Sequence, residues 1–128
     1  MFCSRSWVVW IGLVGWAGRS VGEDRQWPQW RGPNRDSVWP GRVTVEKWSE
    51  QLDLMWKDPI GGGYGGVAVA DNRVIVLDRV KAPREVERVV ALDLATGKTL
   101  WVHEYAVAYG GLDYGNGPRS TPTVHDGR

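Results

Sequence analysis

The chain has 128 residues, a length that suits one domain at most. Eleven per cent of its residues are aromatic and 17 are glycine, and helical patterning is scarce, so an all-β class with tight turns is favoured. A formal net charge of +1, with no basic run, excludes the strong positive field of a nucleic-acid-binding protein. We therefore expect no nucleic-acid partner.

Residues 1–22 are typical of an export signal. Arg5 gives a positive start, an uncharged and mostly apolar run of eleven residues follows, and cleavage is expected after Ala17 or Gly22. This run is shorter than the about 20 residues that span a bilayer, so we expect no stable membrane span. A short uncleaved anchor or a buried helix is the alternative.

Cleavage after Gly22 would remove Cys3, the only cysteine, and would bring the net charge to −1. The mature protein would then be extracytoplasmic, in the periplasm or secreted, and would contain no disulfide and no thiolate nucleophile. Packing and backbone pairing would have to provide all of its stability.

Residues 23–53 are predicted to form an extended leader rich in Trp and Pro. Three Xaa-Pro pairs exclude a helix from its first part, and proline also excludes a central strand. We expect Trp27, Trp30 and Trp39 to be buried, because together on the surface they would form an unusually apolar patch. They would pin the leader across a larger body; the alternative is an aromatic platform for a sugar or a base.

Next come a short strand signal and a glycine-rich stretch. Residues 54–57 have the strand signal, which ends before Pro59. Residues 61–66 contain five glycines but not the spacing of a phosphate-binding loop, and no helical pattern follows. They predict a close approach of the backbone between packed strands.

A meander of four antiparallel strands is predicted after the glycines, near residues 67–70, 73–78, 88–93 and 99–105. Asp71-Asn72 suits a tight hairpin turn, since Asn tolerates the left-handed conformation. Residues 79–88 are charged, and we expect a solvated loop in which Glu85 and Glu87 face water.

The strongest prediction is the hairpin over residues 89–105. Asp93 can accept hydrogen bonds from backbone amides two residues on, and Gly97 can take the positive φ that closes the turn. After the turn, the two-residue period of a strand places Trp101 on one face with Thr99, His103 and Tyr105. Trp101 is the large aromatic anchor of this hairpin.

Two segments recur along the chain. Residues 67–73 return as residues 122–128, and Leu54-Met55-Trp56 returns as Thr99-Leu100-Trp101. Repetition with such a period predicts stacked supersecondary units that bury their faces against one another.

At these residues the chain resembles the PQQ-like β-propeller repeat, which quinoprotein dehydrogenases share with BamB-type outer-membrane assembly factors. The closest agreement is at Ala91-Leu92-Asp93-Leu94-Ala95-Thr96-Gly97-Lys98-Thr99-Leu100-Trp101, and the resemblance covers residues 54–128. The opening Trp-Pro-Gln-Trp-Arg-Gly-Pro also resembles the leader of large secreted bacterial propellers. Asn72 and Ser37 stand where this pattern commonly has Gly.

The resemblance implies an all-β partial propeller, with about one four-stranded antiparallel blade plus flanking strands, preceded by a signal-peptide helix. It implies that Trp101 docks against the neighbouring blade, with Asp93 and Gly97 shaping its turn. Trp56 would supply an outer strand that closes the ring. Because a propeller needs about 4–8 blades, we expect a truncated N-terminal fragment whose partners are the missing blades, with another protein as a further possible partner.

The residues form no catalytic constellation. His103 and His125 lie on separate strands without a metal-ligand spacing. The most suggestive stretch is an insertion between repeats, where a loop on a rigid scaffold could line a ligand cleft. Its candidate ligand residues are Tyr109, Asp113, Tyr114, Asn116 and Arg119. The alternative is an ordered connection whose polar groups satisfy its own backbone.

Two functions remain from different classes. The favoured one is an exported, non-enzymatic propeller module for binding or assembly. The other is a fragment of a PQQ-dependent quinoprotein oxidoreductase, for which PQQ and calcium are implied only by the resemblance. The chain lacks the adjacent cysteine pair that such enzymes often contain, and no cofactor is evident from its residues.

Overall fold

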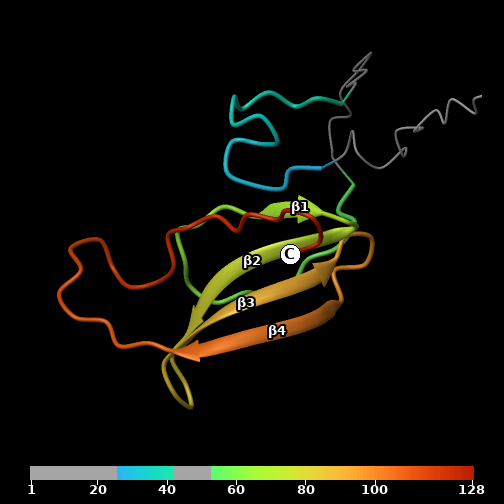
Figure 1. Ribbon diagram of the computed structural model, residues 1–128. Helices are drawn as coiled ribbons and strands as arrows, with labels where there is room; N and C mark the ends of the chain where they lie inside the picture. The colour runs from blue at the N-terminus through green and yellow to red at the C-terminus, as the bar shows by residue number, and fades with distance from the viewer. Residues whose placement is uncertain (1–25, 42–52) are drawn as a thin grey trace, which may run out of the picture.

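The computed structural model describes residues 26–41 and 53–128 (Figure 1). The predicted export signal over residues 1–22, its helix included, and residues 42–52 of the leader lie outside the described residues. Within the described segments the regular structure is one antiparallel sheet in the sequential order β1-β2-β3-β4. These segments contain no helix that could cross a membrane.

The sheet confirms the predicted all-β meander. Its strands are β1 (Ala68–Ala70), β2 (Arg73–Val80), β3 (Val86–Asp93) and β4 (Thr99–Ala106). The prediction of a loop over residues 79–88 was wrong at both ends, since β2 and β3 extend into it. Arg79 lies opposite Glu87 and Val80 lies opposite Val86, so charged residues pair across the strands and only five residues make the connection.

Both predicted hairpin turns form. Asp71 and Asn72 have φ of 50° and 59°, the left-handed pair of the turn that suits the twist of two-residue hairpins. In the next turn Gly97 has a φ of 72°. The Asp93 carboxylate accepts a hydrogen bond from the Thr96 amide at 2.8 Å, three residues on, and a weaker one from the Ala95 amide, two residues on. The Thr96 hydroxyl also donates to this carboxylate, at 2.7 Å.

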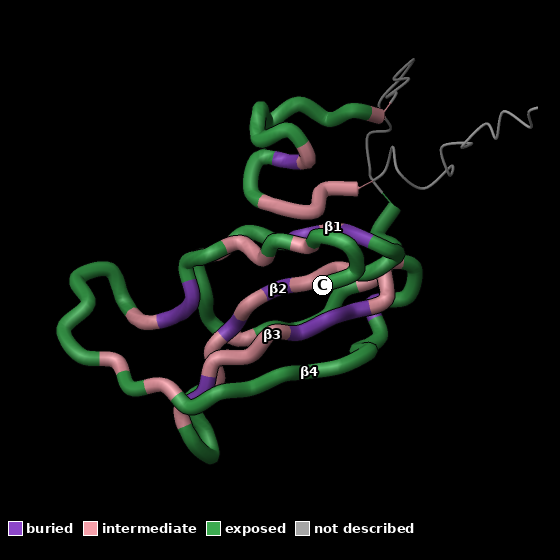
Figure 2. Tube along the Cα trace, viewed as in Figure 1, coloured by how far each residue is buried: buried purple, intermediate pink, exposed green. Residues whose placement is uncertain are grey.

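The sheet has one well-covered face. Val76, Val90 and Leu92 form its buried cluster, against which Trp56 and Val74 pack. Figure 2 shows buried positions on β1, β2 and β3, whereas β4 is exposed along its whole length. The core therefore lies under β2 and β3, and β4 is an open edge among the described residues.

Trp56 reaches this core by its side chain and not through a strand. The strand predicted over residues 54–57 is absent, and Leu54 and Met55 are exposed. The Trp56 indole Nε1 donates to the carbonyl of Leu94 at 2.9 Å. A Cβ added at Gly97 would lie 2.6 Å from the indole, so the glycine leaves the space that this ring occupies.

The glycine-rich stretch approaches its neighbours closely, as predicted. A Cβ added at Gly61 would lie 2.2 Å from the Arg79 carbonyl oxygen, and one at Gly65 would lie 2.3 Å from that of Ser120. Gly62 forms an isolated antiparallel bridge with Arg79. These glycines let the segment run against the sheet on one side and against the C-terminal segment on the other.

The leader meets the sheet through Trp27, whose backbone forms an antiparallel bridge with Val69 of β1 (Figure 1). Trp39 stacks on Trp27 at 6.2 Å between ring centroids. The predicted burial of all three indoles was wrong: Trp27 is half-buried, but Trp30 and Trp39 are exposed. The leader folds on itself, as shown by the hydrogen bond from the Ser37 amide to the Arg31 carbonyl, instead of lying flat on an apolar face.

The internal repeat is visible in the backbone. Asp126 and Gly127 have φ of 48° and 72°, close to the values at the first hairpin turn, and backbone hydrogen bonds between His125 and Arg128 close this second turn. The strand before it is not formed, so the repeat holds for the turn and not for the pairing. The Val124 amide donates to the Pro28 carbonyl at 2.8 Å.

Candidate functional site

The predicted ligand loop leaves the end of β4 and returns along the glycine-rich stretch (Figure 1). Tyr64 holds its far end, because its amide donates to the Pro118 carbonyl at 2.8 Å. The Arg119 guanidinium lies over the Tyr64 ring, 5.2 Å from its centroid. Arg119 also donates to the Gly115 carbonyl at 3.0 Å, so its charged group ties the loop to itself.

The near end of the loop is fixed by two tyrosines that share one acid. The hydroxyls of Tyr105 and Tyr109 both donate to the Glu87 carboxylate, the first at 2.6 Å. Burial, together with this hydrogen bond, raises the pKa of Tyr109 to about 12, and the hydrogen bond to Glu87 also raises the pKa of Tyr105. Both hydroxyls therefore keep their protons near neutral pH and act as donors rather than bases.

Arg79 connects this acid cluster to the loop. Its guanidinium pairs with Glu85, lies 4.8 Å from the centroid of the Tyr109 ring, and donates to the Asn116 backbone carbonyl at 3.3 Å. The side chain is 11% exposed, and its Nε is buried without a partner among the described residues. The prediction of a solvated loop residue was wrong for Glu87, which lies in β3 and binds both tyrosines, whereas Glu85 stays in the connecting loop and pairs there with Arg79.

The five candidate ligand residues thus separate into two groups. Tyr109, Asn116 and Arg119 hold the loop to itself and to the sheet. Asp113 and Tyr114 are exposed, Tyr114 at 83% of its surface. The structure does not bring all five around one cavity, and these contacts support the alternative of an ordered connection.

A buried carboxylate on the core face escaped the sequence prediction. Asp78 of β2 is fully buried and accepts two hydrogen bonds from Arg88, at 2.9 and 2.6 Å, and one from the Gly61 amide at 2.6 Å. Burial alone would raise the pKa of Asp78, but the hydrogen bonds from Arg88 and Gly61 and the charge of Arg88 lower it overall. The two-residue period of the strand could have predicted this burial, because Asp78 stands two positions after Val76 on the face that the strand buries.

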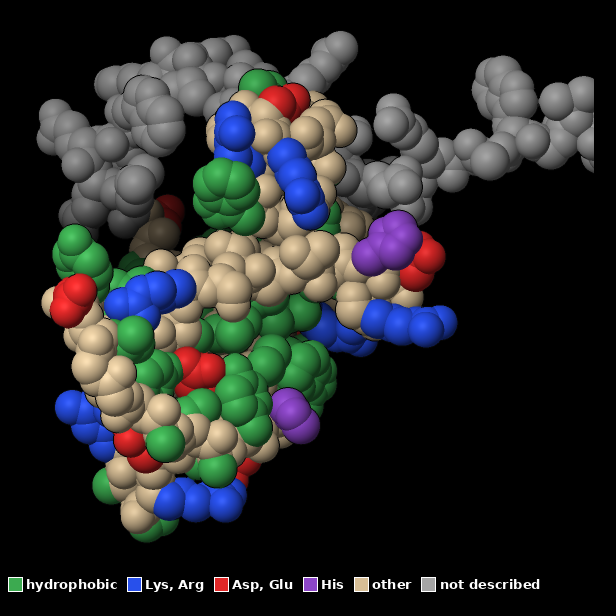
Figure 3. Space-filling model, turned by 60° about the vertical axis from the view of Figure 1, so that its left-hand side comes forward, with side chains coloured by type: hydrophobic (Ala, Val, Ile, Leu, Met, Phe, Trp, Pro, Cys, Tyr) green, Lys and Arg blue, Asp and Glu red, His purple; other side chains and the backbone are tan. Residues whose placement is uncertain are grey.

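The opposite face of the sheet carries an open apolar groove of about 300 Å³. Ile75, Val89 and Trp101 line it from the sheet, and Pro122 and Val124 line it from the C-terminal segment. Trp101 remains 44% exposed. Figure 3 shows a broad hydrophobic area on the molecule, with an acidic group within it and a histidine at its border.

Calcium takes about six to eight oxygen ligands. In residues 26–41 and 53–128, no three His, Cys, Asp or Glu side chains come together as a possible metal-binding group.

Comparisons with family profiles, with curated proteins and with solved structures give no match. The resemblance to PQQ-like repeats consequently rests on the motif at residues 91–101 and on nothing outside the chain. Function has to be argued from the contacts of the folded repeat and from its open surfaces.

Proposed function

We propose that the chain is an exported, non-enzymatic β-propeller repeat module for binding or assembly, with β1–β4 as one blade. The observation that carries the proposal is the recurrence of one turn geometry at two positions that are 55 residues apart. The leader supports it further, because Trp27 pairs with Val69 and Pro28 accepts the amide of Val124, the equivalent residue of the second copy. Two equivalent segments side by side are what neighbouring blades would present.

The tryptophans support the same arrangement. Trp56 fills the space beside Gly97, and Trp101 stands at the equivalent position of the motif 45 residues later. Its ring borders the open groove, where the glycine turn of a following blade could pack on it. In this arrangement each repeat's Trp covers the turn of the next blade, and missing blades of a longer protein would complete the ring.

A binding role is favoured over catalysis by how the polar groups are used. The Asp78 carboxylate accepts hydrogen bonds from the Arg88 side chain and the Gly61 amide. The Glu87 carboxylate accepts them from two tyrosine hydroxyls, which retain their protons. Groups engaged in this way stabilise a scaffold. The surfaces left for a partner, another protein among them, are the apolar groove and the leader.

The proposal is tested by completing the second repeat. Residues 74–106 are appended directly after Arg128, so that the second turn continues into a copy of β2–β4. We expect the Trp101 indole N–H to shift and to become protected from solvent exchange in NMR spectra, because the copied turn covers the ring. The resonance is assigned with Trp101→Phe.

The matched control has the same appended segment with Val in the copied position of Gly97. A Cβ there would occupy the space of the docked ring, so Trp101 should exchange as it does in the original chain. Equal exchange in all three proteins would contradict the blade arrangement. Dye-coupled alcohol oxidation by the full chain loaded with PQQ and calcium would overturn the non-enzymatic assignment.

A further inference from the structure

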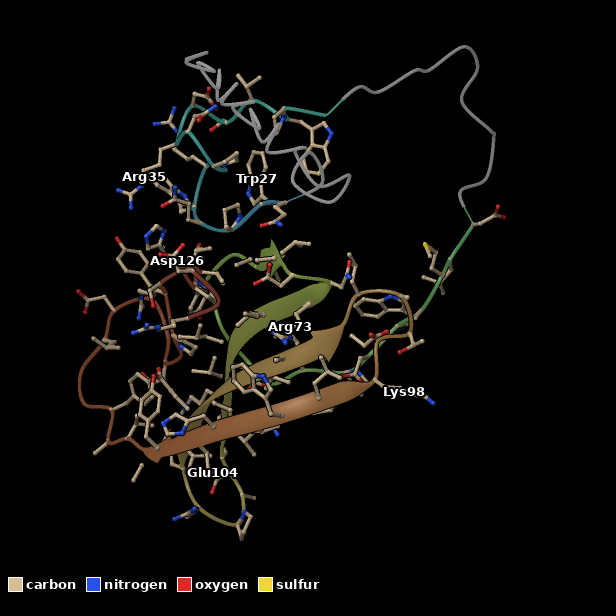
Figure 4. All side chains as sticks on the ribbon, turned by 45° about the vertical axis from the view of Figure 1, so that its right-hand side comes forward. Trp27, Arg35, Arg73, Lys98, Glu104 and Asp126 are labelled. Carbon is tan, nitrogen blue, oxygen red and sulfur yellow. The ribbon has the colours of Figure 1, made fainter. Side chains whose placement is uncertain are left out.

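The leader presents two arginines whose positions are fixed by its own side chains. Arg31 donates through Nε to the Ser37 hydroxyl at 3.0 Å, and Arg35 donates through Nε to the Gln29 side-chain oxygen at 2.9 Å. Within the described residues neither forms an ion pair. Toward the described part of the chain, the two terminal nitrogens of each guanidinium therefore remain available as an oriented fork. Figure 4 shows Arg35 on the outer side of the leader.

An exposed indole lies beside these forks. Trp30 is 65% exposed, and the Arg31 guanidinium lies 5.4 Å from the centroid of its ring. Figure 3 shows two basic side chains beside a large hydrophobic one on one face of the leader. The only basic residues in 26–41 are Arg31 and Arg35. The group thus combines a flat apolar surface with positive charge.

The backbone beneath the group is held in an unusual conformation. Arg31, Arg35 and Ser37 have φ of 64°, 58° and 66°, values that non-glycine residues seldom adopt. Such residues persist only where the surrounding structure imposes them, and they gather at ligand sites and clamps. None of the three takes part in the backbone bridge between the leader and β1, which runs through Trp27.

We propose that Trp30, Arg31 and Arg35 form a binding site for an anionic sugar. The saturated ring of the sugar stacks on the indole, and the guanidinium forks bind its carboxylate or sulfate in bidentate fashion. This site lies outside the sheet and does not depend on the propeller arrangement.

The backbone of the leader argues for a sugar over an extended acidic peptide. The amides of Gly32, Arg35 and Ser37 donate to carbonyls within the loop, and that of Val38 donates to the Asp36 carboxylate. They cannot pair with a peptide strand, which is how extended peptides usually gain affinity. The indole and the guanidinium forks are therefore the groups that we expect to recognise a ligand.

The test uses the full chain and four probes in calorimetry: a galacturonic acid tetramer, a sulfated galactose tetramer, the neutral galactose tetramer and an oligoglutamate. We expect at least one anionic tetramer to bind at least about tenfold more tightly than the neutral sugar, with an affinity that falls as salt is added. Whichever of the two anionic tetramers binds with the higher affinity shows whether the site prefers a carboxylate or a sulfate.

Variants assign the binding to these residues. Trp30→Ala and Arg35→Gln should each weaken the anionic tetramer about tenfold, and Arg31→Lys should weaken it less, because charge is kept but the fork is lost. Arg84→Gln, which removes an exposed arginine at the far hairpin, should leave affinity within about twofold of the original. Circular dichroism shows whether each variant keeps the sheet.

Several results would overturn the proposal. They are no binding of either anionic tetramer, equal binding of the neutral sugar, oligoglutamate binding as tightly as the sugars, or Arg84→Gln weakening affinity as much as Arg35→Gln. The last would mean attraction by net charge alone. None of them bears on whether the appended repeat covers Trp101.

Discussion

At the scale of single residues, Asp78 has the most constrained environment in the described chain. Its carboxylate has no contact with water, yet three hydrogen bonds from Arg88 and Gly61 keep it charged. A buried ion pair of this kind is costly to break, because the remaining charge is left without compensation. The pair also fixes the glycine-rich stretch to the sheet.

Asp78→Asn should lower the free energy of unfolding near neutral pH by about 3 kcal/mol, the lower end for a broken buried pair, because Arg88 is partly exposed. The folded pKa of Asp78 lies below its ordinary value of 3.8. Its stabilising effect is therefore complete above about pH 4 and is lost as the pH falls through the folded pKa. Urea unfolding at about pH 7 and about pH 3 measures both effects.

In the variant this acid-dependent loss should be smaller than in the original chain. Asp113→Asn is the control, since this carboxylate is exposed in the loop and should change stability by less than about 0.5 kcal/mol. An equally steep acid dependence in Asp78→Asn would mean that other carboxylates determine it.

At the scale of elements, the turn after β3 and the indole of Trp56 form one unit. Gly97 has a positive φ and also faces the ring, so a substitution there meets two obstacles. The Trp56 hydrogen bond to the Leu94 carbonyl lies on the same turn. Turn and ring should therefore depend on each other energetically.

Gly97→Ala should destabilise the chain by about 2 kcal/mol, from backbone strain and from displacement of the ring. Trp56→Ala should cost about 2–3 kcal/mol, less than for a fully buried Trp, because the side chain is half-buried. The double variant should cost less than the two together, by at least about 0.5 kcal/mol. Chemical denaturation of the four proteins measures this coupling.

Gly110→Ala is the matched control, because an added Cβ there meets nothing within 4 Å. It should leave the free energy of unfolding nearly unchanged. Strict additivity of the Gly97 and Trp56 effects would show that the turn forms independently of the ring.

The turns were predictable because their information is local. Asp71, Asn72 and Gly97 are residue types that tolerate the left-handed backbone of these turns, and the sheet order follows from short connections. The ends of β2 and β3 were not predictable, since Arg79 becomes a strand residue only through its pairing with Glu87. Charge alone gives the same signal for a loop and for a cross-strand pair.

The candidate site was less predictable for the same reason. The sequence indicates a polar loop at residues 109–119, but whether Tyr109 faces a ligand or Glu87 depends on a residue 22 positions earlier. Likewise, the clustering of Trp27, Trp30 and Trp39 predicts their burial, whereas the turns around Arg31 and Arg35 place Trp30 on the surface. Composition does not report the direction of a side chain.

At the scale of the whole molecule, the sheet is covered unevenly. One face is packed under Trp56, while β4 is exposed along its length and the apolar groove beside Trp101 is open. An open strand edge next to apolar side chains is prone to pair with other chains. The isolated chain should therefore associate as its concentration rises.

Trp101→Lys should reduce this association, because it places a charge in the apolar area beside the open edge. Tyr114→Lys adds the same charge on the exposed loop and should leave association unchanged. Sedimentation velocity over a range of concentrations compares the three proteins. Association that is equally strong in Trp101→Lys would place the contact elsewhere.

The leader's hydrogen bonds have a consequence for the order in which the chain is assembled. Trp27 pairs with Val69, but the carbonyl of the next residue, Pro28, accepts the amide of Val124. During synthesis the first contact requires residue 69 and the second requires residue 124, so a further 55 residues must be added between the two. The leader is thus held in two stages, which are separated by the synthesis of one whole repeat.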